Sequence, residues 1–355
     1  MRASRVLYNL GIPALLKGTI ALKTEMMIYS FSCFMLTKSS RARSPYLRRL
    51  EMCTPGLSDE PEQIVSVIRE SAAAILEQAT HLEYLMFWTC YPLIDVENPS
   101  VITALASITT LRCLDFHNPE KAQKGIEEAF QDTSSPLSEL IVQGFNEEKL
   151  WNNFPQNLLG SVKESLTKLA LSVDPSFLST TLFQLPRVEE LCLHFTHPFS
   201  LESLPRVFPN LKRLTLDAFY ASEKLKGPEV QELLFRKQKS PYKWSSLDYI
   251  RADAKALLCF GPTCAIREVR VDYLDSRWID PLCQFLRTAK PSVLHIDIWF
   301  ENPVYDLPLL LHTISTNGQL DKLVLSFYLA TGPVNSSRDS DAWVRSGYHS
   351  WIGPS

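Results

Sequence analysis

The chain has 355 residues, of which 45% are apolar and 21% are charged, which is ordinary for a globular protein with ample material for a core. Its formal net charge of −3 is close to neutral for this length, so charge alone favours neither nucleic acid nor an anionic membrane as a partner. Twelve glycines are sparse, and no phosphate loop, G-x-G-x-x-G or G-x-S-x-G motif is present, so we expect neither enzymatic activity nor a cofactor.

The first segment, residues 1–45, is expected to be a leader that precedes the repeats. Met26 to Leu36 is an apolar stretch of about eleven residues, which is too short to cross a membrane. Lys17, Lys23 and Glu25 interrupt the sequence before that stretch, unlike the order found in a secretory signal peptide. Eight scattered cysteines lack the two-residue gap of a zinc or thioredoxin motif, and scattered thiols suggest a reducing compartment, cytoplasmic or nuclear.

From residue 46 to residue 327 a six-residue phrase returns eleven times: apolar, two variable, apolar, one variable, apolar. The starts are 19 to 36 residues apart and average about 27, close to the period of a leucine-rich repeat. The second and third apolar positions are two residues apart, so they share the inward face of a strand. The phrases begin at Leu47, Leu82, Leu111, Leu137, Leu166, Val188, Leu211, Leu247, Ile266, Val293 and Leu320.

Stretches with helical periodicity alternate with these phrases. The clearest is Pro61 to Ala79, where apolar residues recur at three- and four-residue steps. Others are expected within residues 99–107, 119–130, 147–164, 175–184, 229–239, 276–288 and 307–316. Strand alternating with helix predicts an α/β leucine-rich-repeat horseshoe, with about eleven parallel strands on the concave face and helices on the convex face.

The third, fifth and seventh positions of each phrase point away from the core and should line the concave face. One group of these residues is aromatic and apolar, the composition of a binding hot spot, and consists of Tyr84, Met86, Trp88, His117 and Ile141. A protein or extended peptide is the expected partner. The alternative is that a flanking loop covers these side chains.

A second group on the same face alternates in charge and includes Arg251, Arg270, Asp272, His295 and Asp297, with Asp217 and Asp253 nearby. Mutual salt bridging is one interpretation, and recognition of a charged peptide is the other. The neighbouring arginines argue against a metal site among these acidic and histidine side chains. His194 and His197, near a strand end, are interpreted as ordinary loop histidines.

Three N-terminal segments carry a family resemblance: RVLYNLGIPALL at residues 5–16, SFSCFML at 30–36 and PYLRRL at 45–50. Their order resembles fungal F-box leucine-rich-repeat proteins of the basidiomycete type, and the architectural similarity extends to about Phe327. In that family a short strand follows the Ile-Pro segment. The resemblance implies a substrate-recognition subunit of a cullin–RING ubiquitin ligase, in which the F-box binds a Skp-type adaptor and the repeats choose the substrate.

The F-box itself would precede Arg5, so only its last helix, around Ser4 to Leu10, is expected in this chain, and the adaptor is a doubtful partner. The alternative is a leucine-rich-repeat scaffold with no link to ubiquitin transfer. After Phe327 the repeat pattern stops, and residues 328–355 are expected to form an irregular, poorly ordered tail.

Overall fold

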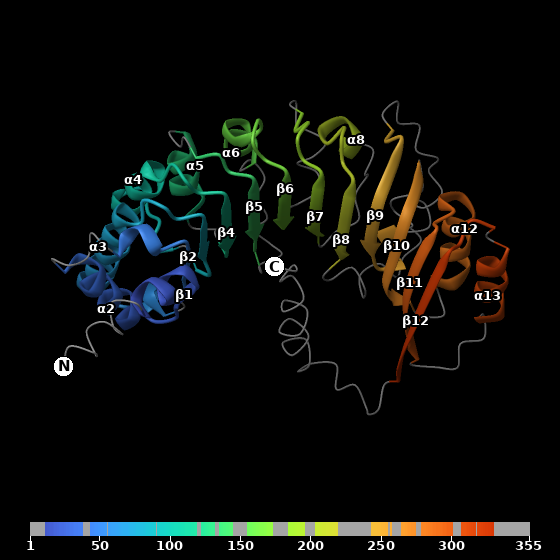
Figure 1. Ribbon diagram of the computed structural model, residues 1–355, viewed down its shortest axis with the longest axis horizontal. Helices are drawn as coiled ribbons and strands as arrows, with labels where there is room; N and C mark the ends of the chain where they lie inside the picture. The colour runs from blue at the N-terminus through green and yellow to red at the C-terminus, as the bar shows by residue number, and fades with distance from the viewer. Residues whose placement is uncertain are drawn as a thin grey trace.

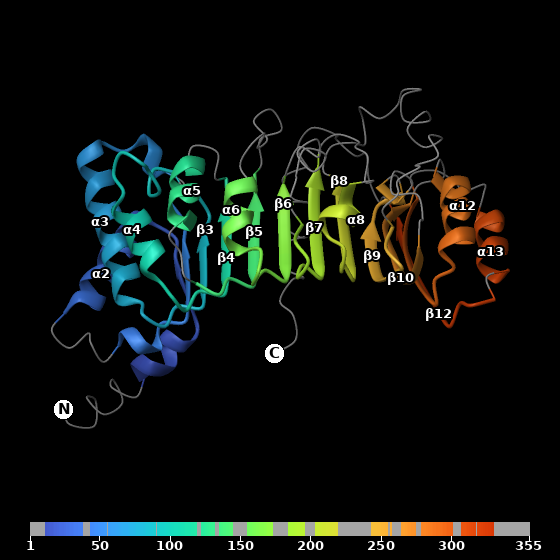
Figure 2. The ribbon, with the colours of Figure 1, turned by 90° about the horizontal axis from the view of Figure 1, so that it is seen from above.

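Twelve parallel strands form one open sheet, in which every strand lies beside its neighbours in chain order. The structure is a computed structural model that describes residues 11–37, 43–54, 56–89, 91–118, 122–131, 135–144, 155–172, 184–195, 203–218, 243–254, 256–257, 264–274, 278–300, 307–316 and 318–329. The strands line the inner side of an arc and the helices cover its outer side (Figure 1), and all strands run in the same direction (Figure 2). The predicted leucine-rich-repeat horseshoe is confirmed.

The strands follow the repeated phrase closely. They are β1 (Thr19–Leu22), β2 (Arg49–Met52), β3 (Tyr84–Phe87), β4 (Cys113–His117), β5 (Glu139–Gln143), β6 (Lys168–Ser172), β7 (Glu190–Phe195), β8 (Arg213–Ala218), β9 (Ser246–Ala252), β10 (Ala265–Leu274), β11 (Val293–Phe300) and β12 (Lys322–Leu329). Strands β2 to β8 each begin at the third position of a phrase, and the register places equal positions side by side, such as Leu50 beside Leu85.

The sheet contains one strand more than the eleven phrases predict. Strand β1, in the segment expected to be a leader, pairs in parallel with β2 and places Ile20 beside Leu50 and Leu22 beside Met52. These two residues occupy the second and third apolar positions of a phrase, but Lys17 stands at the first position. Because of this lysine, the segment does not match the apolar phrase. The family resemblance, however, did imply a short strand there.

Helices connect the strands on the convex side. They are α2 (Glu25–Leu36), α3 (Glu62–Gln78), α4 (Ser100–Ser107), α5 (Gln123–Gln131), α6 (Pro155–Val162), α8 (Leu204–Val207), α12 (Ile279–Ala289) and α13 (Leu307–Ser315), with short 3-10 turns η2 (Ser44–Tyr46) and η3 (Leu57–Asp59). Six of the eight expected helices coincide with or overlap α3, α4, α5, α6, α12 and α13. The expected helix at 229–239 and nearly all of that at 175–184 lie outside the described residues, as does the tail from residue 330.

The core lies between the sheet and the helices and is made by the apolar positions of the phrase. Leu50, Leu85 and Phe87 are fully buried, and burying one such side chain contributes about 1.5–3 kcal/mol. The rings of Phe87 and Phe116 stack with centroids 5.8 Å apart on adjacent strands. Because these residues hold each strand with one face inward, the alternate residues face the concave side. None of the helices in the described part of the chain is long and apolar enough to traverse a lipid bilayer.

Candidate binding surface on the concave face

The structure brings the predicted aromatic residues together on β3, β4 and β5. We call Tyr84, Met86, Trp88, His117 and Ile141 the aromatic patch. Tyr84, Met86 and Ile141 are half-buried, and Trp88, directly after β3, is the most exposed of the five at 36%. The backbone N–H of Trp88 donates to the carbonyl of Met52 at 2.8 Å, which extends the pairing of β3 with β2 to this residue.

The indole ring of Trp88 rests on a buried polar pair. Its ring stacks on the imidazole of His117 with centroids 4.5 Å apart and an interplanar angle of 19°. His117 Nε2 lies 3.0 Å from Asp115 Oδ1, and the His117 side chain is only 4% exposed. The prediction that His117 lines the open surface is therefore corrected: Trp88 is exposed on the face, whereas His117 is buried beside it with its ring stacked against the indole.

Tyr84 is held from two sides. Its hydroxyl lies 3.5 Å from Asp115 Oδ2, and the Arg49 guanidinium stands 4.6 Å from the centre of its ring. Burial, and then the charge of Asp115, raise the pKa of the Tyr84 hydroxyl, so it stays neutral at physiological pH. Burial, followed by the charge of Glu139, likewise raises the pKa of the Cys113 thiol. The patch therefore presents the neutral rings of Tyr84 and Trp88, and the hydroxyl of Tyr84 lies next to the buried Asp115 carboxylate.

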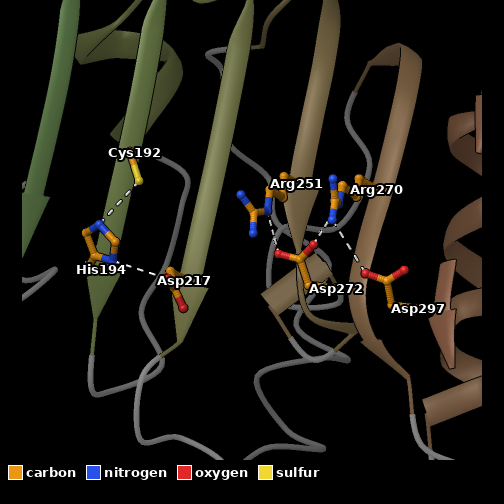
Figure 3. Close-up of polar contacts among 7 residues, drawn as sticks. All are labelled: Cys192, His194, Asp217, Arg251, Arg270, Asp272 and Asp297. Atoms are coloured by element: carbon orange, nitrogen blue, oxygen red, sulfur yellow. Dashed lines mark hydrogen bonds and ion pairs between the residues drawn. The ribbon is translucent and has the colours of Figure 1, made fainter. Parts of the chain in front are cut away.

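Four of the predicted charged residues form a connected set of ion pairs on β9, β10 and β11. We call Arg251, Arg270, Asp272 and Asp297 the charged network (Figure 3). Asp272 accepts from Arg251 Nε at 2.5 Å and from Arg270 Nε at 2.9 Å, and Arg270 Nη2 lies 3.6 Å from Asp297 Oδ2. The interpretation as mutual salt bridging describes what the structure contains.

The other charged residues predicted nearby belong to different contacts. His295 Nε2 lies 4.0 Å from Glu268 Oε1, and Asp253 Oδ1 accepts from the backbone N–H of Ala256 at 2.6 Å. The Asp253 side chain therefore closes a turn after β9. Among the described residues, no group of three or more His, Cys, Asp or Glu side chains is arranged to hold a metal ion.

A third cluster, which we call the thiol–histidine cluster, lies on β7 and β8 and was not predicted. It consists of Cys192, His194 and Asp217, with Cys192 Sγ 3.4 Å from His194 Nε2 and His194 Nδ1 3.4 Å from Asp217 Oδ2 (Figure 3). The interpretation of His194 as a loop histidine is wrong, because the residue lies within β7 and pairs in register with Asp217. His197 lies outside the described residues.

The spacing of the sequence does contain a signal for this cluster. Cys192 and His194 are two residues apart and so share a strand face, and Asp217 occupies the same phrase position as His194 in the next repeat. Comparing equal positions of neighbouring repeats is therefore sufficient to place the three side chains together.

No protein-family model and no curated protein matches the chain. Among solved structures, the chain is similar to the leucine-rich-repeat protein LegL7 from Legionella pneumophila, with a TM-score of 0.47, 14% identity and coverage of 85% of this chain and 90% of LegL7. It is also similar to a chain of the Rad7–Elc1 complex of yeast, with a TM-score of 0.41, 14% identity and coverage of 83% of this chain and 79% of that chain. Both likenesses are remote and concern the fold alone.

Proposed function

We propose that this protein is a recognition protein that captures a protein or an extended peptide on the concave face of its sheet. The observation that carries the proposal is Trp88, an exposed ring stacked on the buried pair formed by His117 and Asp115. A ring that is already fixed loses little conformational freedom on binding, so more of its contact energy appears as affinity. Tryptophan and tyrosine are also the residues most enriched at binding hot spots.

The dimensions of the face favour an extended partner. Twelve strands at about 4.8 Å each give a surface roughly 50 Å long, with the aromatic patch towards one end and the charged network towards the other. A partner that spans both would gain apolar burial at the first and orientation from the second, because exposed charges contribute mainly to specificity and association rate.

A finer role follows from the N-terminal resemblance: recognition of substrates for a cullin–RING ubiquitin ligase, in the cytoplasm or nucleus. Several apolar side chains at this end of the solenoid are exposed, namely Leu15, Met26, Met27, Tyr29 and Leu36. Such a surface suits contact with a further protein module or an adaptor. A scaffold with no link to ubiquitin transfer is the alternative.

Selection from a displayed library of random peptides tests the main proposal. We expect the wild-type protein to enrich specific peptides, and the Tyr84→Ala, Trp88→Ala double variant to lose most of their binding while keeping its folded circular dichroism spectrum. Val67→Ala, an exposed apolar residue on the convex helix α3, is the matched control and should bind normally. Equal binding by the double variant and the control would contradict the proposal.

The ligase role has a separate test. A purified Skp-type adaptor is mixed with this chain and with a version extended upstream, and complex formation is followed by size-exclusion chromatography. Binding of the adaptor by either version supports the finer role. Failure of both versions to bind overturns the ligase role and favours the scaffold, without affecting recognition on the concave face.

A further inference from the structure

The middle of the concave face carries a thiol whose surroundings differ from those of an ordinary buried cysteine. Cys192 is 8% exposed, and its sulfur lies 3.4 Å from His194 Nε2 on the same strand. The other ring nitrogen, Nδ1, lies 3.4 Å from Asp217 Oδ2 on β8. A thiol on one side of an imidazole and a carboxylate on the other is the arrangement in which histidine acts as a base towards a nucleophile.

The strands impose this geometry. Cys192 and His194 point to the same face of β7 because they are two residues apart, and the register sets His194 directly beside Asp217. On the other side of β7, Ser172 of β6 pairs with His194, and its small side chain lets Gln143 of β5 bring its amide within 3.5 Å of His194 Nε2. The imidazole is therefore held between neighbouring strands on both sides.

The charges around His194 favour its protonated form. Burial alone would lower the pKa of His194, but Cys192 and Asp217 outweigh burial and raise this pKa to about 10. The side chain is 15% exposed, and Asp217, at 49%, faces open solvent. Among the described residues, the titratable groups in contact with the imidazole are Cys192 from its own strand and Asp217 from β8, while Gln143 and Ser172 on the other side are neutral.

We propose that Cys192 is a nucleophilic thiol and a site of covalent modification by small disulfides, with His194 as its base and Asp217 as the residue that positions the imidazole. In the reaction, His194 Nε2 holds the proton that Cys192 gives up, and the sulfur attacks one sulfur of the disulfide. The disulfide bond breaks as the new bond forms, and the leaving thiolate takes up the proton from His194. Cys192 is oxidised to a mixed disulfide, and one equivalent of small thiol is released.

The reaction of the full chain with 2,2′-dipyridyl disulfide tests the proposal, because the released thione is followed by absorbance and the modified cysteine is identified by peptide mass spectrometry. The exposed Cys33 of α2 is the internal reference. At pH 6 we expect Cys192 to react about 10-fold faster than Cys33, because the His194 imidazole lies 3.4 Å from its sulfur and can take up the thiol proton, whereas Cys33 has no such partner among the described residues. Its rate should also change little between pH 6 and 8, whereas the rate at Cys33 rises steeply.

Two substitutions separate the roles of the partners. His194→Gln should reduce the rate at Cys192 by about 100-fold at pH 6, the range expected for loss of a positioned base. Asp217→Asn should lower the reaction rate at Cys192 by a smaller factor and shift the pH at which this rate rises to a higher value. Asp217→Glu should restore the pH dependence of the wild-type protein. Asp217 lies at the surface, so its variants remain informative if His194→Gln does not fold.

The proposal is overturned if Cys192 reacts more slowly than Cys33 at every pH. It is also overturned if the Asp217→Asn variant keeps the wild-type rate and pH profile, because Cys192 would then be a buried thiol without activation.

Discussion

The aromatic patch and the charged network lie on the same sheet but are held together in different ways. Beside the exposed ring of Trp88, on the neighbouring strand, is a buried polar pair, His117 and Asp115, whose side chains are almost inaccessible to water. The charged network is more exposed: Arg251, Arg270, Asp272 and Asp297 are all partly exposed and bond to one another along the surface. The difference is one of exposure: the polar pair beside Trp88 is buried, and the ion pairs of the charged network are open to water.

This difference has consequences for both stability and binding. Removing one partner of a buried pair leaves a desolvated group uncompensated and is strongly destabilising. Removing one partner of an exposed pair costs little, because water and salt replace it. Substitutions in the buried part of the aromatic patch should therefore reduce both stability and binding. Substitutions in the charged network should change binding with little effect on stability.

The largest expected effect is on stability, at the base of the aromatic patch. Asp115→Ala removes the carboxylate 3.0 Å from His117 Nε2 and 3.5 Å from the Tyr84 hydroxyl, so the buried His117 and the half-buried Tyr84 each lose a polar neighbour. We expect the free energy of unfolding to fall by about 3 kcal/mol. Urea denaturation followed by circular dichroism measures this change.

The matched control is Asp248→Ala, which removes an exposed carboxylate 3.9 Å from Arg267 and should cost less than about 1 kcal/mol. Equal costs for the two variants would show that Asp115 is solvated in the folded protein and that the aromatic patch has no buried foundation.

The second effect is on affinity, and it distinguishes the two regions by their response to salt. With a peptide selected by the wild-type protein, Trp88→Ala should weaken binding by about 30-fold, or about 2 kcal/mol, and leave its salt dependence unchanged. Arg270→Ala should weaken binding only a few-fold and reduce the salt dependence, because exposed charges are screened. Titration calorimetry at low and high sodium chloride gives both quantities, and a salt-sensitive loss at Trp88 would reverse the assignment.

The sequence predicted the architecture and the faces of the strands because both follow from spacing. Apolar residues two apart specify the inward face, and this rule places Tyr84 and Arg251 on the concave side as expected. The phrase does not predict strand β1, because Lys17 occupies the first position, where the other repeats have an apolar residue. One charged residue at the end of the helical segment before a strand is tolerated by the fold, but the repeat then lacks the complete apolar pattern.

The burial of individual concave residues was not predictable from the same spacing. Parity places His117 on the open face, but its exposure depends on how the Trp88 ring from the neighbouring strand lies across it, which is a matter of rotamers and packing. The cluster around His194 is a different case. Its members occupy positions that the phrase aligns. The sequence therefore does predict the cluster, but only when equivalent positions of adjacent repeats are compared.

A third expected effect concerns pH and the thiol–histidine cluster between the two regions. The pKa of His194 is raised in the folded state from 6.5 to about 10, so protonation favours folding. This contribution to stability is fully present below about pH 6.5 and is lost as pH rises through about 10. We expect the wild-type advantage over His194→Gln in free energy of unfolding to shrink steadily as the pH rises across this range, because the folded protein then loses the proton on His194. Urea denaturation at a series of pH values measures the difference.

Asp217→Asn is the companion variant for this measurement. It removes the carboxylate 3.4 Å from His194 Nδ1 and should abolish part of the pH dependence while leaving stability near pH 10 almost unchanged. A wild-type advantage that grows as pH rises would contradict the protonated state assigned to His194.

The smallest expected effect is the coupling within the charged network. Arg270 Nη2 and Asp297 Oδ2 lie 3.6 Å apart at the surface. A double-mutant cycle with Arg270→Ala and Asp297→Ala should give a coupling energy below about 1 kcal/mol that declines further in high salt. The same cycle on Asp115 and His117 should give a larger value that salt hardly changes, because that pair is buried. If the two couplings were equal in size and in salt response, the concave face would be electrostatically uniform. The aromatic patch and the charged network would then not make different contributions to partner recognition.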